Sequence, residues 1–130
     1  MIRAMICVVA IALVCFVSCG KDHEGLPTGF DYDPPPTPSD FQATAGVEQA
    51  HLSWSYPAES LPTLLEFRVY YYYSIYDMVE LVGTTTETEF TDTQLIGNVE
   101  YCYRVSAVDT SDFEGWRTAV QCVTVLSGFR

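Results

Sequence analysis

The chain has 130 residues, of which 17 are acidic and 6 basic, so its formal net charge is −11 at pH 7. Lys and Arg form no cluster anywhere in it, and this composition argues against a nucleic-acid partner, because phosphates would be repelled at every contact. Once its ends are set aside, a chain of this length holds one folded domain at most.

The chain opens with an apolar run from Ala4 to Val17 that follows a single positive charge at Arg3. A helix needs about 20 apolar residues to span a bilayer, so this run is too short to cross one. Its length and flanks are typical of the hydrophobic region of a secretory signal. We therefore predict that residues 1–18 are a signal peptide.

The run ends in Phe16-Val17-Ser18-Cys19-Gly20, which resembles the lipobox of bacterial lipoproteins, with Phe16 in place of the usual leucine. The resemblance implies that Cys19 is the lipidated residue and the membrane anchor. An ordinary cleaved signal followed by a free cysteine is the alternative. Gly20 stands where aspartate tends to retain such proteins at the inner membrane, so the resemblance implies the outer membrane of a bacterial cell envelope, with a periplasmic or a surface-exposed domain.

The next segment, residues 19–37, begins with the lipidated cysteine and is polar, acidic and rich in proline. Such a composition cannot bury a core and behaves as an extended, semi-rigid spacer. We expect it to act as a tether between the lipid anchor and a folded domain.

From Ser39 onward, short segments alternate apolar and polar residues between turn residues, with no stretch of helical periodicity. Alternation with a period of two is typical of strands that bury one face. The predicted strands cover residues 41–45, 50–55, 66–74, 78–84, 88–93, 101–109 and 118–125. About seven short strands at regular spacing predict an all-β sandwich or small barrel.

Tyr101 opens the sixth predicted strand, six residues after Leu95 and just after the Gly97-Asn98 turn. This arrangement suggests a corner in which the ring packs into the core and the hydroxyl reaches back to the backbone of the preceding turn. Asn accepts a positive φ more readily than most residues, which suits such a turn.

Four motifs in order resemble a fibronectin type III domain over roughly residues 37–126. They are Leu52-Ser53-Trp54, Phe67-Arg68-Val69-Tyr70, Phe90-Thr91-Asp92-Thr93-Gln94-Leu95 and the stretch 101–109. The resemblance implies a seven-stranded antiparallel immunoglobulin-like β-sandwich over residues 38–126, followed by a tail at 127–130. The implied core consists of Ala50, Leu52, Trp54, Phe67, Val69, Tyr71, Phe90, Leu95, Tyr101, Tyr103 and Val105, with Trp54 and Tyr101 as its largest members.

Of the five cysteines, two leave with the signal and Cys19 takes the lipid, so Cys102 and Cys122 remain. Two cysteines in an exported domain are a disulfide candidate. If the last two strands form a hairpin that pairs them, the turn is centred on Asp112, in the most turn-like stretch between them. We expect a cross-strand disulfide, with two free thiols as the alternative.

Residues with catalytic potential are few. His23 lies in the tether and His51 on the outward side of a strand, and no zinc spacing, phosphate-binding loop or catalytic triad can be argued. Asp109, Asp112 and Glu114 offer oxygen atoms that calcium favours, but their spacing matches no defined calcium loop, and a solvated acidic turn is the favoured reading. We predict no enzymatic activity, no cofactor and no metal.

The candidate binding surface consists of Arg68, Tyr70, Tyr72, Arg104 and Trp116. Strand alternation places the first four away from the core, and exposed tyrosine beside arginine is favoured at protein interfaces, while aromatic rings also stack on sugars. The alternative is a face covered by side-chain stems and loops that binds nothing.

The predicted function is a lipid-anchored binding or scaffolding module whose partner is an unknown envelope protein. The alternatives are an accessory module that recognises a polysaccharide at the cell surface and a purely structural stalk.

Overall fold

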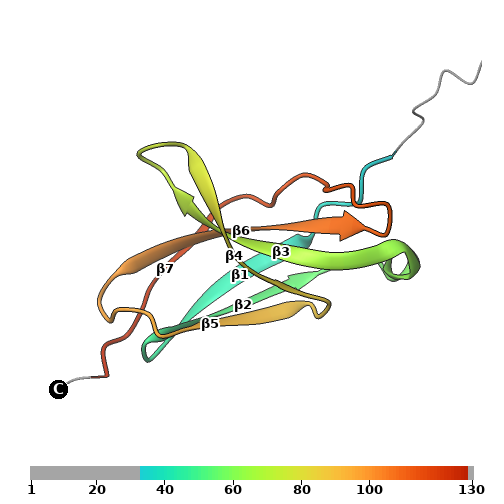
Figure 1. Ribbon diagram of the computed structural model, residues 1–130. Helices are drawn as coiled ribbons and strands as arrows, with labels where there is room; N and C mark the ends of the chain where they lie inside the picture. Colours follow the sequence, from blue (N-terminus) through green and yellow to red (C-terminus); the bar gives the residue numbers. More distant parts are fainter. Residues whose placement is uncertain (1–32, 129–130) are drawn as a thin grey trace, which may run out of the picture. The chain divides into compact units, whose positions relative to one another are not determined.

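The computed structural model describes residues 33–128 (Figure 1). The predicted signal peptide, Cys19 and most of the tether therefore lie outside the described residues. Within this range, no helix combines the length and apolar character needed to cross a membrane.

Within residues 33–128, seven strands form two antiparallel sheets, as the sequence predicts. The three-stranded sheet has the order β1-β2-β5 and the four-stranded sheet the order β4-β3-β6-β7. The strands are β1 (Ser39–Gly46), β2 (Gln49–Ser55), β3 (Leu64–Tyr73), β4 (Met78–Thr85), β5 (Glu89–Thr93), β6 (Glu100–Asp109) and β7 (Gln121–Thr124). A short 3-10 helix, η1 (Ala58–Thr63), joins β2 to β3, and the sequence pattern did not predict it.

The core lies between the two sheets and contains most of the predicted side chains. Trp54 packs edge-on against Phe67 with 5.3 Å between the ring centroids. Tyr101 was predicted among the largest core residues, but it is only half-buried, and the largest fully buried side chain is Tyr103. Tyr71 is also half-buried, at the edge of the same cluster.

Tyr101 forms the predicted corner. Its hydroxyl oxygen accepts a hydrogen bond from the backbone N–H of Ile96 at 3.0 Å, in the turn before β6. Asn98 takes a positive φ of 63° in this turn, and its N–H donates to the carbonyl of Val125 at 2.7 Å. The corner therefore fixes the start of β6 and also the chain beyond β7.

The hairpin from β6 to β7 pairs Cys102 with Cys122, and a disulfide joins them. A bond that closes a loop of this length stabilises by about 3 kcal/mol in the chain-entropy model. The last strand is shorter than predicted, because residues 113–120 bond to β6 at isolated points and form no regular ladder with it. The backbone N–H of Thr118 donates to the carbonyl of Val105 at 2.8 Å, and the hydroxyl oxygen of Thr118 accepts the N–H of Val105 at 3.1 Å.

Candidate binding surface on the four-stranded sheet

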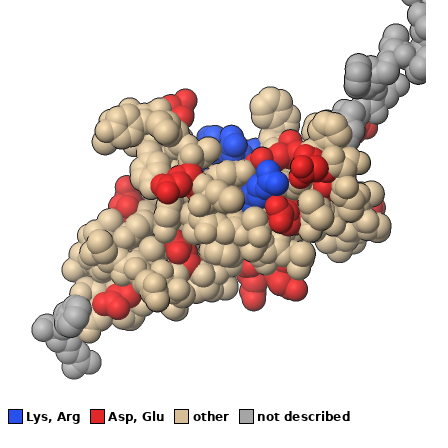
Figure 2. All heavy atoms as spheres, viewed as in Figure 1, with Lys and Arg blue, Asp and Glu red and all other residues tan. Residues whose placement is uncertain are grey.

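The outer face of the four-stranded sheet carries every cation among residues 33–128. These are Arg68 on β3, Arg104 on β6 and Arg117 in the segment after β6. Carboxylates surround the arginine side chains on the face drawn in Figure 2. This face is therefore the one place in the described chain where positive charge gathers.

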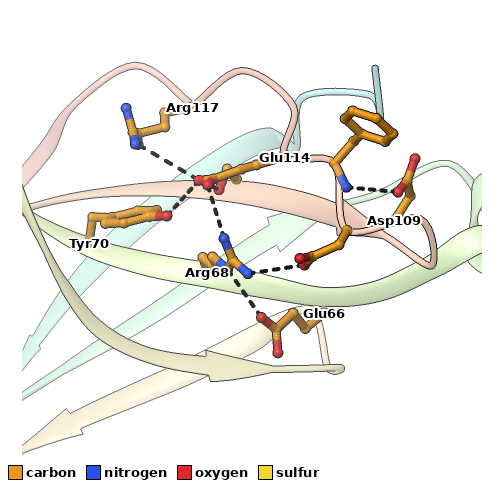
Figure 3. Close-up of polar contacts among 9 residues, drawn as sticks. Glu66, Arg68, Tyr70, Asp109, Glu114 and Arg117 are labelled. Carbon is orange, nitrogen blue, oxygen red and sulfur yellow. Dashed lines mark hydrogen bonds and ion pairs between the residues drawn. The ribbon is translucent and has the colours of Figure 1, made fainter. Parts of the chain in front are cut away.

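Glu114 joins the segment after β6 to this face (Figure 3). Its Oε1 accepts hydrogen bonds from the hydroxyls of Tyr70 and Ser106, both at 2.6 Å. Its Oε2 accepts from Nη1 of Arg68 at 3.2 Å, and Nε of Arg117 lies 3.9 Å from Oε1. The side chain thus reaches over β6, where Ser106 lies, to β3.

These contacts determine the ionisation of Glu114. Burial disfavours the charged carboxylate, but the hydrogen bonds from Ser106 and Tyr70 and the charges of Arg117 and Arg68 outweigh it, so the pKa of Glu114 lies below its ordinary value of 4.5. Arg68 also binds Glu66, with 3.1 Å between Nε and Oε1. We call Glu114 and its partners the Glu114 cluster; these partners are Arg68, Tyr70, Ser106 and Arg117. At neutral pH its carboxylate is charged.

The prediction that Tyr70 is exposed is wrong, although its side chain does lie on the outer face. The residue is only 8% exposed, because the guanidinium of Arg117 lies over its ring at 4.6 Å and its hydroxyl is bound to Glu114. Burial and that hydrogen bond raise the pKa of Tyr70. Its ring is not available to a partner.

The other predicted surface residues remain at least partly accessible. Tyr72 is half-buried, its hydroxyl donates to Oδ1 of Asp77 at 3.0 Å, and the guanidinium of Arg104 lies 5.1 Å from its ring centroid. Trp116 is 77% exposed. The structure thus brings Arg68 and Tyr70 into the Glu114 cluster and leaves Tyr72, Arg104 and Trp116 for contact.

The three carboxylates considered as calcium ligands have other contacts. Oδ1 of Asp109 accepts the backbone N–H groups of Ser111 at 2.9 Å and Phe113 at 3.0 Å. Asp112 lies 3.7 Å from Nη2 of Arg68. Together with Glu114, they hold the turn and the following segment in place.

Sequence reasoning missed the apolar side chains of the β3–β4 hairpin. Ile75 is 87% exposed and Tyr76 72%, and Tyr73 and Met78 are also exposed. This hairpin projects from the body of the sandwich in Figure 1. Strand alternation assigns a face only to residues within a strand, so it says nothing about a hairpin tip. The presence of apolar residues in a turn was the available signal.

Among the cavities that open on this part of the molecule, two flank Tyr72 and Arg104. One has a volume of about 500 Å³ and is lined by Pro34, Arg104, Glu114, Gly115, Trp116 and Arg117. The other, of about 330 Å³, lies between the β3–β4 hairpin and the start of β6. Tyr72 connects the two regions, because Arg104 covers its ring and Asp77 of the hairpin binds its hydroxyl.

The arrangement of two antiparallel sheets around one core defines an immunoglobulin-like β-sandwich. No family model matches the sequence, and no curated protein is detectably similar to it. Solved structures show that the fold is that of fibronectin type III domains. A Fn3-like protein from Clostridium thermocellum is 22% identical with a TM-score of 0.60, over 75% of this chain and 100% of that one.

Two further solved structures have the same fold. The fibronectin type III domain of human fibronectin type III domain containing protein 3 is 16% identical, with a TM-score of 0.63 over 76% of this chain and 93% of that one. A β-1,2-glucanase from Parabacteroides distasonis is 16% identical, with a TM-score of 0.60. That match covers 74% of this chain but only 13% of the glucanase, so it concerns one part of that enzyme.

Proposed function

We propose that the protein is a non-enzymatic binding module, held at the bacterial envelope by lipid on Cys19, that docks an envelope protein on the outer face of its four-stranded sheet. The observation that supports this is the exposure of Trp116, at 77%, on the face that gathers the arginines. Trp, Tyr and Arg are the residue types that most often dominate the binding energy of interfaces.

The β3–β4 hairpin extends this surface. Ile75, Tyr76 and Met78 are all more than half exposed at its tip. Apolar side chains that lie together on a surface are typical of sites that bind another molecule. The hairpin and Trp116 therefore give the domain apolar contacts on both sides of Arg104 and Tyr72.

The envelope location is supported by the lipobox resemblance at residues 16–20 and by the proline-rich composition that follows. Metabolic labelling with an alkyne fatty acid tests the anchor: the wild type should be labelled and pellet with membranes, and Cys19→Ala should be unlabelled and released. Protease added to intact cells then separates surface display, in which the domain is degraded, from a periplasmic domain, which is protected.

A photo-crosslinking experiment in living cells tests the docking surface. A photoreactive phenylalanine analogue at position 116 or 76 should give the same discrete adduct with one protein. The matched control carries the analogue at His51, which is exposed on the three-stranded sheet. Adducts that are identical from all three positions, or absent from the first two, would contradict the proposal.

Recognition of a polysaccharide is the second candidate function, because the exposed ring of Trp116 beside a polar cavity also suits stacking on a sugar. A glycan array with the full chain distinguishes the two. Two observations together would favour polysaccharide recognition over protein docking. They are binding to a defined glycan that is lost in Trp116→Ser, and the absence of a protein adduct in cells.

A further inference from the structure

We propose that the cavity lined by Arg104, Arg117 and Trp116 binds a carboxylate of the partner, supplied by a Glu or Asp side chain within an otherwise apolar protein segment. This inference rests on the proposed function, because it names the chemical group that the partner presents to the same face.

Arg104 is the first reason. Its guanidinium lies over the ring of Tyr72, and its Nε is buried without a hydrogen-bond partner. Among residues 33–128 it forms no ion pair, whereas Arg68 and Arg117 both contact Glu114. A guanidinium offers five donors in a planar fork that fits a carboxylate. Arg104 is thus a positioned cation without a counter-ion in the described part of the chain.

Glu114 does not supply that counter-ion. It lines the cavity, but its oxygens already accept hydrogen bonds from Ser106, Tyr70 and Arg68. Two guanidinium groups therefore line a cavity whose single carboxylate is already occupied. The volume of about 500 Å³ leaves room for a second carboxylate and its neighbouring atoms.

The charge distribution favours one isolated carboxylate over a polyanion. Residues 33–128 carry 14 acidic residues and three arginines, and carboxylates border the arginine side chains in Figure 2. A chain with many negative charges, such as a polyuronate, would be repelled outside the cavity. Trp116 at the cavity and the apolar β3–β4 hairpin instead offer contacts to an apolar segment.

The test is a titration of the full chain with a capped peptide, Leu-Tyr-Glu-Leu, followed by nuclear magnetic resonance. The matched probe is the same peptide with Gln in place of Glu. We expect the Glu peptide to shift the Nε–H signals of Arg104 and Arg117 and the indole N–H of Trp116. We also expect it to bind about tenfold more tightly than the Gln peptide, which corresponds to about 1.4 kcal/mol. The difference should shrink as salt is added, because ions screen an accessible ion pair.

Two substitutions of Arg104 make the assignment specific. Arg104→Gln should abolish the preference for the Glu peptide. Arg104→Lys keeps the charge but loses the planar fork, so it should retain only part of the preference. Unchanged signals from the amides of Gly115 and Thr118 will show that the neighbouring segment is still in place.

Four results would overturn the inference. The first is the absence of carboxylate-specific shifts at about 10 mM peptide, a concentration at which millimolar binding would be seen. The second is an equal response to the two peptides, and the third is a preference for the Glu peptide that Arg104→Gln preserves. The fourth is tighter binding of an oligouronate than of the Glu peptide, which would favour an acidic glycan. Photo-crosslinking that succeeds while this titration fails would refute the carboxylate site and leave the docking surface intact.

Discussion

Asp92 on β5 and Glu114 after β6 each accept two hydroxyl hydrogen bonds, but they hold different parts of the molecule. Oδ2 of Asp92 binds Tyr71 at 2.6 Å and Tyr103 at 2.9 Å, so it joins the three-stranded sheet to the four-stranded one. Glu114 instead attaches the segment after β6 to the outer face. Among the described residues, arginines contact Glu114, whereas no cation contacts Asp92.

The difference lies in burial and charge. Asp92 is 9% exposed and Tyr103 is fully buried, so water cannot take the place of either partner if their hydrogen bond is lost. Burial first, and then the bond to Asp92, raise the pKa of Tyr71 and of Tyr103. Glu114 is nearer to solvent and neutralised by arginines. We therefore expect Asp92 to contribute to global stability and Glu114 to hold the segment after β6 against the sheet.

The largest expected effect is that of Asp92→Ala. It leaves the hydroxyls of Tyr71 and Tyr103 without their acceptor inside the sandwich, and each lost bond to a charged group is worth about 1.5–3 kcal/mol. We expect the free energy of unfolding to fall by about 3 kcal/mol or more in urea titrations.

Glu89→Ala, at an exposed position on the same strand, is the control and should change stability by less than about 0.5 kcal/mol. Equal effects of the two substitutions would show that Asp92 does not join the sheets energetically.

Glu114→Ala should have a smaller and more local effect. It removes the acceptor of Tyr70, Ser106 and Arg68, and we expect a global loss of about 1–2 kcal/mol. Hydrogen exchange should accelerate at the amides of Gly115 and Thr118, which bond to β6, and remain slow within the core strands. If exchange accelerates uniformly, the role of Glu114 is global and the contrast with Asp92 fails.

Acid should loosen the segment after β6. The direction of this pH effect on stability follows from the lowered pKa of Glu114. A carboxylate that is easier to ionise in the folded protein stabilises it above its ordinary pKa of 4.5, and the contribution is lost as pH falls through the lowered value. The protection of the Gly115 and Thr118 amides, measured relative to their intrinsic exchange rates at each pH, should therefore fall below about pH 4.5. Glu114→Gln should remove this pH dependence, and its persistence in the variant would assign it to another carboxylate.

Much of the fold could be predicted from the sequence, because strand alternation and the Tyr101 corner are local patterns. The pairing of Cys102 with Cys122 also followed, because a constant register sum places the turn near Asp112. The contacts of the surface could not be predicted in this way. Alternation placed Tyr70 on the outer face, but its burial depends on Glu114 and Arg117, which come from an irregular segment without a register.

The smallest expected effect on stability belongs to the residues proposed to bind. Trp116 and Tyr76 are 77% and 72% exposed, and an exposed side chain away from a buried polar group contributes little to the folded state. Trp116→Ser combined with Tyr76→Ser should change the free energy of unfolding by less than about 0.5 kcal/mol per site, measured in urea, and should abolish the protein adduct in cells. A large loss of stability would mean that these rings serve the fold, as the carboxylates do, and that their exposure does not mark an interface.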